Sequence, residues 1–477
     1  MSRLLPIAVL LAALLAVLLL LPGPERAATP AGGTATDSGD RIVAITDVQV
    51  FDGNRLHEGA TLLMADGFVQ ALSAEVPVPA GATVIDGRGR TALPGLIDAH
   101  VHAFGPALRD AARFGVTTVL DMFRPPMDFD HTRARRADRS PSQRADLFSA
   151  GYLATVAGGH GTQFGIGVPT LSSPDAAEAW VQARLDEGSD WIKIVLEDGS
   201  VYGDDLPTLG GATVRALVKA AHERDVLAIA HVSTHAHARL AVAAGVDGLV
   251  HLFGDRAIDD ALLQTMVERD VFVVPTLTVL AAACGRSGAA WLRDRPGFAD
   301  RLNGMQRQTL ARAFPGTDDR GALWERTLAN LARLRAAGVP VLAGSDAPNP
   351  GTAHGASLHH ELILLVRNGW TAIEALRAAT AAPADAFGLD RRGCLRPGCI
   401  ADVLLVAGDP TEDIAATTRI AGVWKNGHPI SNGEDSRRSG ALETGGAILY
   451  AGVMWNPAAT PRPPAASGLE IRGARLQ

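Results

Sequence analysis

Alternating strand-like and helix-like segments across the middle of this chain limit its fold more than any other feature. Short runs rich in apolar and β-branched residues recur there, and segments with helical patterning separate them. Strands that are separated by helices pair in parallel, and eight such units close into a barrel. The sequence therefore predicts an α/β fold with a (β/α)8 TIM-like barrel. The expected strands are 96–101, 117–121, 147–155, 191–196, 227–232, 248–253, 271–277 and 341–345.

Short β-rich runs flank this middle region on both sides. Turn pairs such as Asp66-Gly67 and Asn426-Gly427 separate them, as in β-hairpins. The 477 residues are enough for a barrel and a second, smaller domain. We expect a small β-sandwich domain built from both chain ends. The expected segments are 41–92 and 393–431 for this domain, 93–392 for the barrel and 432–477 for a C-terminal tail.

The N-terminus resembles a targeting segment. Arg3 precedes an unbroken apolar run over residues 4–21, which Pro22 and small residues close. This pattern predicts that residues 1–31 are a secretory signal peptide, and the length of the run also allows an uncleaved membrane anchor. Either reading predicts an exported, periplasmic or extracellular protein that touches a membrane only through that anchor.

Net charge limits the expected partners, and the cysteine spacing limits the expected metal sites and disulfides. The formal net charge is -7 and no long basic run appears, so a nucleic-acid partner is not expected. The shorter basic stretch 133–144 is interpreted as a solvated helix face, and a homo-oligomer stays open. Cys284, Cys394 and Cys399 have no zinc-site spacing. Cys394 and Cys399 lie in one Gly- and Pro-containing turn and could pair in an oxidising compartment, which the sequence leaves open.

The end of the first expected strand carries His100 and His102. Residues i and i+2 of a strand face the same side, so both imidazoles could reach one metal. Lys193 lies inside a strand that should be buried on both faces. A buried ammonium must be paired, neutralised or modified. Carbamylation by carbon dioxide would turn Lys193 into an anionic bridge between two metals, whereas the alternative is a lysine that reaches solvent at the strand end.

Three more metal-compatible side chains end expected strands: His231, His251 and Asp346. A lone histidine at a strand end is more often structural than a ligand. The argument rests on the set, because six such side chains fall at the carboxyl ends of five strands, where barrel enzymes place their chemistry. Imidazole and carboxylate ligands suit zinc, and also iron or manganese.

The segment 93–102 resembles the opening motif of the amidohydrolase superfamily, and the lysine, histidines and aspartate follow in the order of that superfamily. Gly344-Ser345-Asp346-Ala347, His354-Gly355 and Glu361-Leu362 resemble its Xaa-Pro dipeptidase and imidazolonepropionase-like branch. The resemblance extends over residues 42–423, including the return to the β domain at 393–405.

The resemblance implies a binuclear site with two divalent ions, zinc being expected. By this likeness, one ion is bound by His100, His102 and Asp346, and the other by His231 and His251, with carbamylated Lys193 bridging them. Such ions turn a bridging water into hydroxide at neutral pH and polarise the substrate carbonyl. Asp346 would take the proton of the attacking water and pass it to the leaving nitrogen.

The expected reaction is therefore hydrolysis of an amide-type C–N bond in a small substrate. Candidate substrates are an Xaa-Pro dipeptide, an N-acyl amino acid, and an aryl amide or carbamate. A cyclic-amide hydrolase stays open. A mononuclear deaminase is disfavoured because Lys193 is present and no glutamate closely follows His231. A non-catalytic scaffold is the least favoured reading, since all six ligands are kept.

Three loop residues are candidates for substrate contacts. His160 and Tyr202 follow the third and fourth expected strands and could stabilise an oxyanion or hold a substrate carboxylate; the alternative is that they face solvent. His354 is a third candidate near the site. His235 and His237 are expected on a helix outside the metal ligands, and His359 and His360 on a helix surface.

Overall fold

The computed structural model describes residues 42–315 and 320–431. The expectations for residues 1–31 and for the tail 432–477 fall outside the described residues. Among the described helices, none has both the length and the apolar character that crossing a membrane requires.

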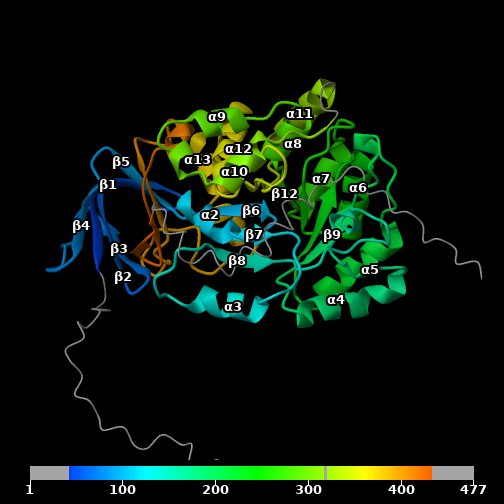
Figure 1. The fold of residues 1–477 in the computed structure, drawn as a ribbon, viewed down its shortest axis with the longest axis horizontal. Helices are drawn as coiled ribbons and strands as arrows, with labels where there is room; N and C mark the ends of the chain where they lie inside the picture. The colour runs from blue at the N-terminus through cyan, green and yellow to red at the C-terminus, as the bar shows by residue number, and fades with distance from the viewer. Residues whose placement is uncertain (1–41, 316–319, 432–477) are drawn as a thin grey trace, which may run out of the picture. The chain divides into compact units, whose positions relative to one another are not determined.

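The two β-rich flanks meet in one mixed eight-stranded sheet, where the N-terminal and C-terminal strands lie side by side (Figure 1). The junction is the antiparallel pairing of β5 with β13, in which Leu93 lies opposite Leu404. The strand order is β15-β14-β13-β5-β1-β2-β3, with β4 beside β1. These strands are β1 (Val43–Phe51), β2 (Leu56–Ala65), β3 (Phe68–Ser73), β4 (Thr83–Asp86), β5 (Arg90–Pro94), β13 (Val403–Ala407), β14 (Ile420–Lys425) and β15 (His428–Pro429).

The Asp66-Gly67 turn signal is confirmed. β2 and β3 pair from Ala65 and Phe68, so this dipeptide is the whole connection. Asp66 and Gly67 have φ angles of 54° and 81°. Both angles are left-handed, as a two-residue hairpin turn of this kind requires. Aspartate and glycine tolerate that backbone at low cost.

Two parallel sheets form the α/β part. One has the order β6-β7-β8 and the other β12-β11-β10-β9. Nearly every residue of these strands is buried, as in parallel sheets with both faces covered. The strands are β6 (Leu96–Val101), β7 (Val116–Asp121), β8 (Asp146–Ser149), β9 (Ile192–Leu196), β10 (Ala228–Val232), β11 (Gly248–Val250) and β12 (Phe272–Val274).

Single parallel bridges connect these two sheets on both sides. Ala154 bridges Ile194 on one side, and Val341 bridges Val273 on the other. Ala99 N–H then donates to the carbonyl of Ala343. The segments 147–155 and 341–345 were expected to be full strands, but the regular strand pairing in them is shorter than expected or absent. β8 ends at Ser149, just before Gly151 with its φ of 66°, and the 341–347 segment pairs only through isolated bridges.

Helices follow the strands, as the alternation predicted, and side-chain caps mark where two of them begin. The Thr234 hydroxyl caps α6 by accepting the N–H of His237, and the Asp259 carboxylate caps α7 by accepting that of Leu262. Caps of this kind satisfy otherwise unpaired N–H groups. The helices are α2 (Ala107–Arg113), α3 (Phe129–Ala137), α4 (Ala177–Asp186), α5 (Gly211–His222), α6 (His235–Ala244), α7 (Asp260–Glu268), α8 (Leu277–Ala283), α9 (Ala289–Asp294), α10 (Gly304–Ala311), α11 (Gly321–Ala337), α12 (Ala356–Arg367), α13 (Ala372–Ala378) and α14 (Ala381–Ala386).

The basic stretch 133–144 is mostly exposed, as expected for a solvated face, but two of its arginines also bind other segments. Arg136 forms two hydrogen bonds with the Asp190 carboxylate, at 2.7 and 2.6 Å. Arg139 donates to the Asn426 side chain at 2.7 Å. The stretch therefore links α3 to the parallel sheets through the half-buried Asp190 carboxylate, and to the mixed sheet through the buried Asn426 side chain.

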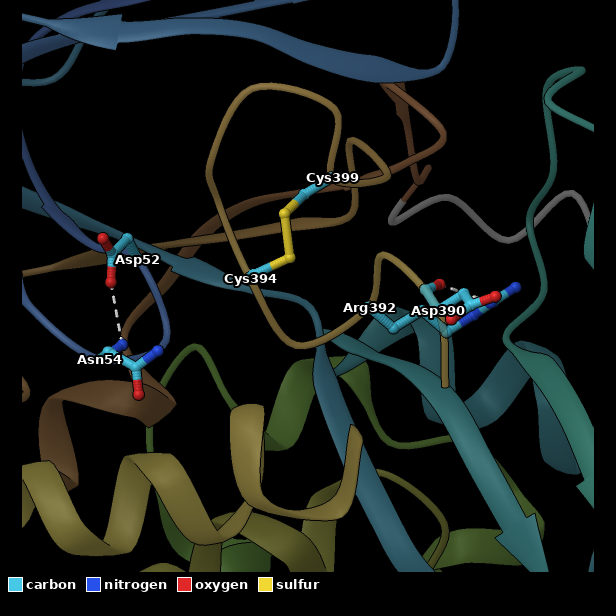
Figure 2. The surroundings of a disulfide bond; sticks show 6 residues. All are labelled: Asp52, Asn54, Asp390, Arg392, Cys394 and Cys399. Atoms are coloured by element: carbon cyan, nitrogen blue, oxygen red, sulfur yellow. Dashed lines mark hydrogen bonds between the residues drawn. A yellow bond between two sulfur atoms is a disulfide. The ribbon is translucent and has the colours of Figure 1, made fainter. Parts of the chain in front are cut away.

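Cys394 and Cys399 form a disulfide in the loop that leads into β13. Figure 2 shows this bond near Asp52, at the end of β1. The Leu395 N–H donates to the Asp52 carbonyl at 3.0 Å, so the bridged loop is attached to the mixed sheet. Cys284 is a free, buried thiol.

Candidate metal centre

The parallel strands bring the six predicted ligands together. An apolar cluster inside the α/β part contains Trp191 of the chain segment before β9 and Ile229 of β10. Lys193 and His231 stand two residues further along these segments, so their side chains share that inward face. Both side chains therefore lie above the same apolar layer, Lys193 from inside β9 and His231 from the end of β10.

Irregular backbone conformations orient three other predicted ligands, His100, His251 and Asp346. The register of β6 against β7 shifts between Asp98 and Val101, so a bulge surrounds His100. Bulges re-aim side chains and are frequent beside active sites. His251 and Asp346 have φ angles of 66° and 53°. A left-handed backbone at residues other than glycine costs about 1–3 kcal/mol and clusters at functional sites.

The carboxylate of Asp346 lies at the centre of the group. Its Oδ1 is 3.4 Å from His100 Nε2 and 3.1 Å from His102 Nε2. Ligand atoms of His100, His251 and Asp346 all lie within 4.8 Å of one another. The His231 ring is 4.5 Å from that of His251, centroid to centroid. The described side chains thus form one compact donor set.

Burial sets the protonation of this set. It keeps the imidazole pKa values of His100, His231 and His251 well below the ordinary histidine value, and nearby Lys193 adds to the shift. Burial also lowers the pKa of Lys193 to about 7, against the opposing charges of Asp346 and Asp121. Neutral imidazole and neutral amine are the forms that bind metal or react with carbon dioxide.

Partners of the second ring nitrogen orient two of the histidines. His251 Nδ1 lies 2.7 Å from the Thr276 hydroxyl. His102 Nδ1 lies 3.4 Å from the Phe123 carbonyl. Each contact leaves Nε2 directed to the cluster, which is how metal-binding histidines are held in their tautomer.

The donor set fits divalent ions. In the described part of the chain, the buried His100 Nδ1 has no hydrogen-bond partner, and neither does Asp346 Oδ1, since its contacts with the two Nε2 atoms lack hydrogen-bond geometry. Such orphaned buried atoms are rare and point to an ion or ligand. Imidazole nitrogens with a carboxylate are the donors that zinc prefers.

Two further buried carboxylates brace the strands that carry ligands. Asp98 accepts from the backbone N–H and the hydroxyl of Ser345, at 2.9 and 2.6 Å. Asp121 accepts from Ala103 N–H and the Ser149 hydroxyl, at 2.7 and 2.5 Å. Burial raises the pKa of Asp98 to about 7. Asp98 thereby fixes the residue directly before Asp346 to β6.

Glu197 is a site residue that the sequence interpretation missed. It follows β9 directly, is 3 % exposed, and places Oε2 3.4 Å from His231 Nε2. Its position at the carboxyl end of a buried strand is the same signal that selected the six ligands. This contact weakens one part of the argument against a deaminase. No glutamate closely follows His231 in sequence, but Glu197 lies beside it in the structure.

The three substrate-contact candidates lie in different settings. The His160 ring is 5.1 Å from that of His231, and burial lowers the His160 pKa to about 4. Tyr202 is 38 % exposed, with the Arg320 guanidinium 5.2 Å from its ring. His354 is buried and its Nε2 lies 3.0 Å from the His102 carbonyl. His160 is thus beside the ligands, Tyr202 is partly open to solvent, and His354 contacts the backbone of a ligand.

The placement of His359 and His360 on a helix surface was wrong. Both are buried, at 0 % and 4 % exposure. His359 Nε2 lies 2.8 Å from the Phe114 carbonyl, which explains how α12 can bury it. His235 and His237 lie on α6, as expected, and their Nε2 atoms contact Asp259 and Asp198.

The comparisons with known proteins agree with this geometry. Residues 91–430 match the model of the amidohydrolase family. An uncharacterized protein of Mycobacterium tuberculosis is 30% identical over 355 residues, which cover 70% of this chain and 84% of that protein. An imidazolonepropionase of Deinococcus deserti is 25% identical over 405 residues, which cover 78% of this chain and 92% of that protein.

Solved structures show the same fold. That of an Xaa-Pro dipeptidase with methionine in its active site matches with a TM-score of 0.65 at 22% identity, covering 81% of this chain and 99% of that one. The expected resemblance is confirmed: the chain belongs to the amidohydrolase family and is a hydrolase that acts on C–N bonds.

Proposed function

We propose that this protein is a binuclear metal-dependent hydrolase of the amide-type C–N bond in a small substrate. The observation that carries the proposal is the buried set of His100, His251 and Asp346, whose ligand atoms lie within 4.8 Å of one another. His102, His231 and Lys193 surround that set. We further propose that the parallel strands and bridges form a closed (β/α)8 barrel, beside a β-sandwich built from both chain ends.

The residues divide into two ligand groups. His100, His102 and Asp346 would hold one divalent ion, His231 and His251 the other, and carbamylated Lys193 would bridge them; zinc is the proposed metal. When bound, such ions make a water molecule more acidic and polarise a carbonyl group. The burial of Lys193 supports carbamylation, because a neutral amine is the form that adds to carbon dioxide.

The side chains around the ions would move the protons and hold the substrate. Asp346 accepts a proton from the attacking water and delivers it to the leaving nitrogen, since its carboxylate is within reach of both ligand groups. His160, beside His231, is placed to donate to a developing oxyanion. The partly exposed Tyr202 is proposed to contact the distal part of the substrate. His354, whose Nε2 lies 3.0 Å from the His102 carbonyl, is proposed as a support for that ligand rather than as a substrate contact.

Two substrate classes are proposed, in order. The structural likeness to an Xaa-Pro dipeptidase favours an open-chain substrate: a dipeptide, an N-acyl amino acid, or an aryl amide or carbamate. The second class is a cyclic amide, which is favoured by the relative named for an imidazolone.

Metal analysis of the purified chain, paired with hydrolysis assays, tests the proposal. About two divalent ions per chain and release of a free amine from dipeptides or N-acyl amino acids are expected. Ring opening without amine release would select the cyclic class. One ion per fully remetallated chain would contradict the binuclear site and favour a deaminase-like arrangement with Glu197 in the proton-transfer role. No bound ion would favour a scaffold.

A further inference from the structure

The ring nitrogens of three of the histidines around Asp346 are oriented by different kinds of partner. His102 faces a backbone carbonyl and His251 a hydroxyl, as described above. His231 instead faces a carboxylate that is not itself a predicted metal ligand, because its Nε2 lies 3.4 Å from Glu197 Oε2. We propose that Glu197 is a positioning residue that fixes the tautomer of His231 and increases its strength as a metal ligand. This inference rests on the proposed metal centre.

Glu197 is itself held rigidly. Its Oε1 accepts the Gly199 N–H at 2.7 Å and the Ser233 hydroxyl at 3.0 Å. The other oxygen is left for His231. The Ser233 hydroxyl lies 3.4 Å from His237 Nδ1, and His237 Nε2 lies 3.5 Å from Asp198 Oδ2. The carboxylate is therefore held by Gly199 in the loop after β9 and by Ser233 in the loop after β10, and His237 of α6 contacts Ser233 in turn.

The orientation of His231 follows from this contact. Glu197 Oε2 is placed to accept a hydrogen bond from the ring, and in that arrangement the proton of the His231 ring sits on Nε2. The lone pair is then on Nδ1, the nitrogen that remains for an ion. A carboxylate behind a histidine also makes the opposite nitrogen more basic, and removing such a partner typically weakens metal binding about 10- to 100-fold.

The test measures zinc affinity for each ion by competition with chelators, on the full chain. Glu197→Ala is expected to weaken one of the two ions about 10- to 100-fold and to leave the other unchanged. Glu197→Gln keeps an acceptor oxygen, so it should restore part of that affinity. Cobalt absorption of the wild type and Glu197→Ala gives a second readout, because the changed ligand field at one site should alter the spectrum.

Two variants serve as comparisons. Ser233→Ala removes only the hydroxyl that aims Glu197, so we expect a smaller, few-fold loss of affinity for the same ion. This variant keeps the test available if Glu197→Ala folds poorly. Glu178→Ala alters an exposed glutamate of α4 that contacts Arg224, and both affinities should stay at the wild-type value. If the wild type binds two ions and folded Glu197→Ala binds both with the same affinities, this inference is overturned and the metal centre stands. A wild type that binds no ion would overturn the metal centre and the inference with it.

Discussion

Asp346 combines several tasks in one side chain. It contacts both His100 and His102, and its left-handed backbone turns it into the cluster. Burial by itself would raise its pKa, but the neighbouring His102, His251 and Lys193 hold the pKa below the ordinary aspartate value. The carboxylate is therefore ionised at neutral pH, as a ligand and proton acceptor must be.

Asp346→Asn removes the proton acceptor and keeps the volume. We expect kcat to fall about 10²- to 10⁴-fold, the usual contribution of a general acid–base group, while the circular dichroism spectrum stays the same. Steady-state kinetics on the substrate found in the screen measure this. Turnover equal to that of the wild type would contradict the proton-transfer role.

Lys193→Ala removes the bridging group. We expect the variant to bind at most one ion where the wild type binds two, with kcat/KM at least about 100-fold lower, as for other losses of metal-site groups. Added short carboxylic acids should restore part of the activity, since they can fill the space of the carbamate. Lys219→Ala, at an exposed ion pair with Glu223, is the matched control. Full metal content in Lys193→Ala would show that the lysine is not a bridge.

The sequence predicted these ligands because each one lies in, or at the end of, a segment with a strong β pattern. Glu197 obeys the same rule and was still missed, because glutamate is common at strand ends and only its contact with His231 singles it out. Its contact with His231 joins neighbouring strands β9 and β10, and no spacing along the chain encodes which side chains of adjacent strands touch.

At the level of elements, a buried ion cluster connects β8 with the mixed sheet. Asp146 of β8 accepts from Lys425 of β14 at 3.0 Å and from Arg392 at 2.6 Å, and all three side chains are nearly inaccessible. Burial opposes ionisation, but the charges of Lys425 and Arg392 prevail and hold the pKa of Asp146 below its ordinary value.

Asp146→Asn leaves two buried cations without this carboxylate. We expect the free energy of unfolding at pH 7 to fall by about 3–5 kcal/mol, the usual cost of breaking a buried ion pair. Because the folded-state pKa is lowered, the stabilisation is complete above the unfolded-state pKa and is lost as pH falls through the folded value. The difference between variant and wild type should therefore shrink below about pH 4.

Urea unfolding at several pH values measures this difference. Asp86→Asn is the control, because Asp86 and Arg88 form an exposed pair whose loss should change little. A deficit in Asp146→Asn that stays constant down to pH 2.5, a value below the ordinary aspartate pKa of about 3.9, would contradict the assignment.

The disulfide closes a short loop, with a sequence separation of 5 between Cys394 and Cys399. Cross-linking a loop of this length stabilises a protein by about 2 kcal/mol through the entropy of the unfolded chain. The double variant Cys394→Ser/Cys399→Ser should lose that amount and keep its metal content. Unfolding curves of the wild type with and without reductant should show the same difference, and overlapping curves would contradict it.

At the level of the whole molecule, a formed disulfide is consistent with an oxidising compartment, where such bonds persist. We propose that residues 1–31 direct export, in agreement with the basic residue and apolar run at the N-terminus. After expression in a bacterial host, the protein should be found in the periplasmic or extracellular fraction or on the outer side of the membrane. N-terminal sequencing decides between cleavage near residue 31 and an intact anchor. A chain that stays in the cytoplasm with its N-terminus intact would contradict export.

The sequence by itself determined the α/β class, the β-rich flanks, the family and the six ligand candidates. Each of these can be predicted from short stretches of sequence, because apolar periodicity and turn residues act over a few neighbouring positions. Lys193 could thus be assigned to a buried strand, and His231 to a strand end, from their own segments alone.

Only the tertiary structure decided which groups meet. The contact between Glu197 and His231, the burial of His359 and the ion cluster at Asp146 depend on strand order and packing. The left-handed backbone of His251 and Asp346 is likewise imposed by the surroundings, since each residue alone would prefer another conformation. These features arise from contacts between segments that lie far apart in the chain, so local sequence pattern does not contain them.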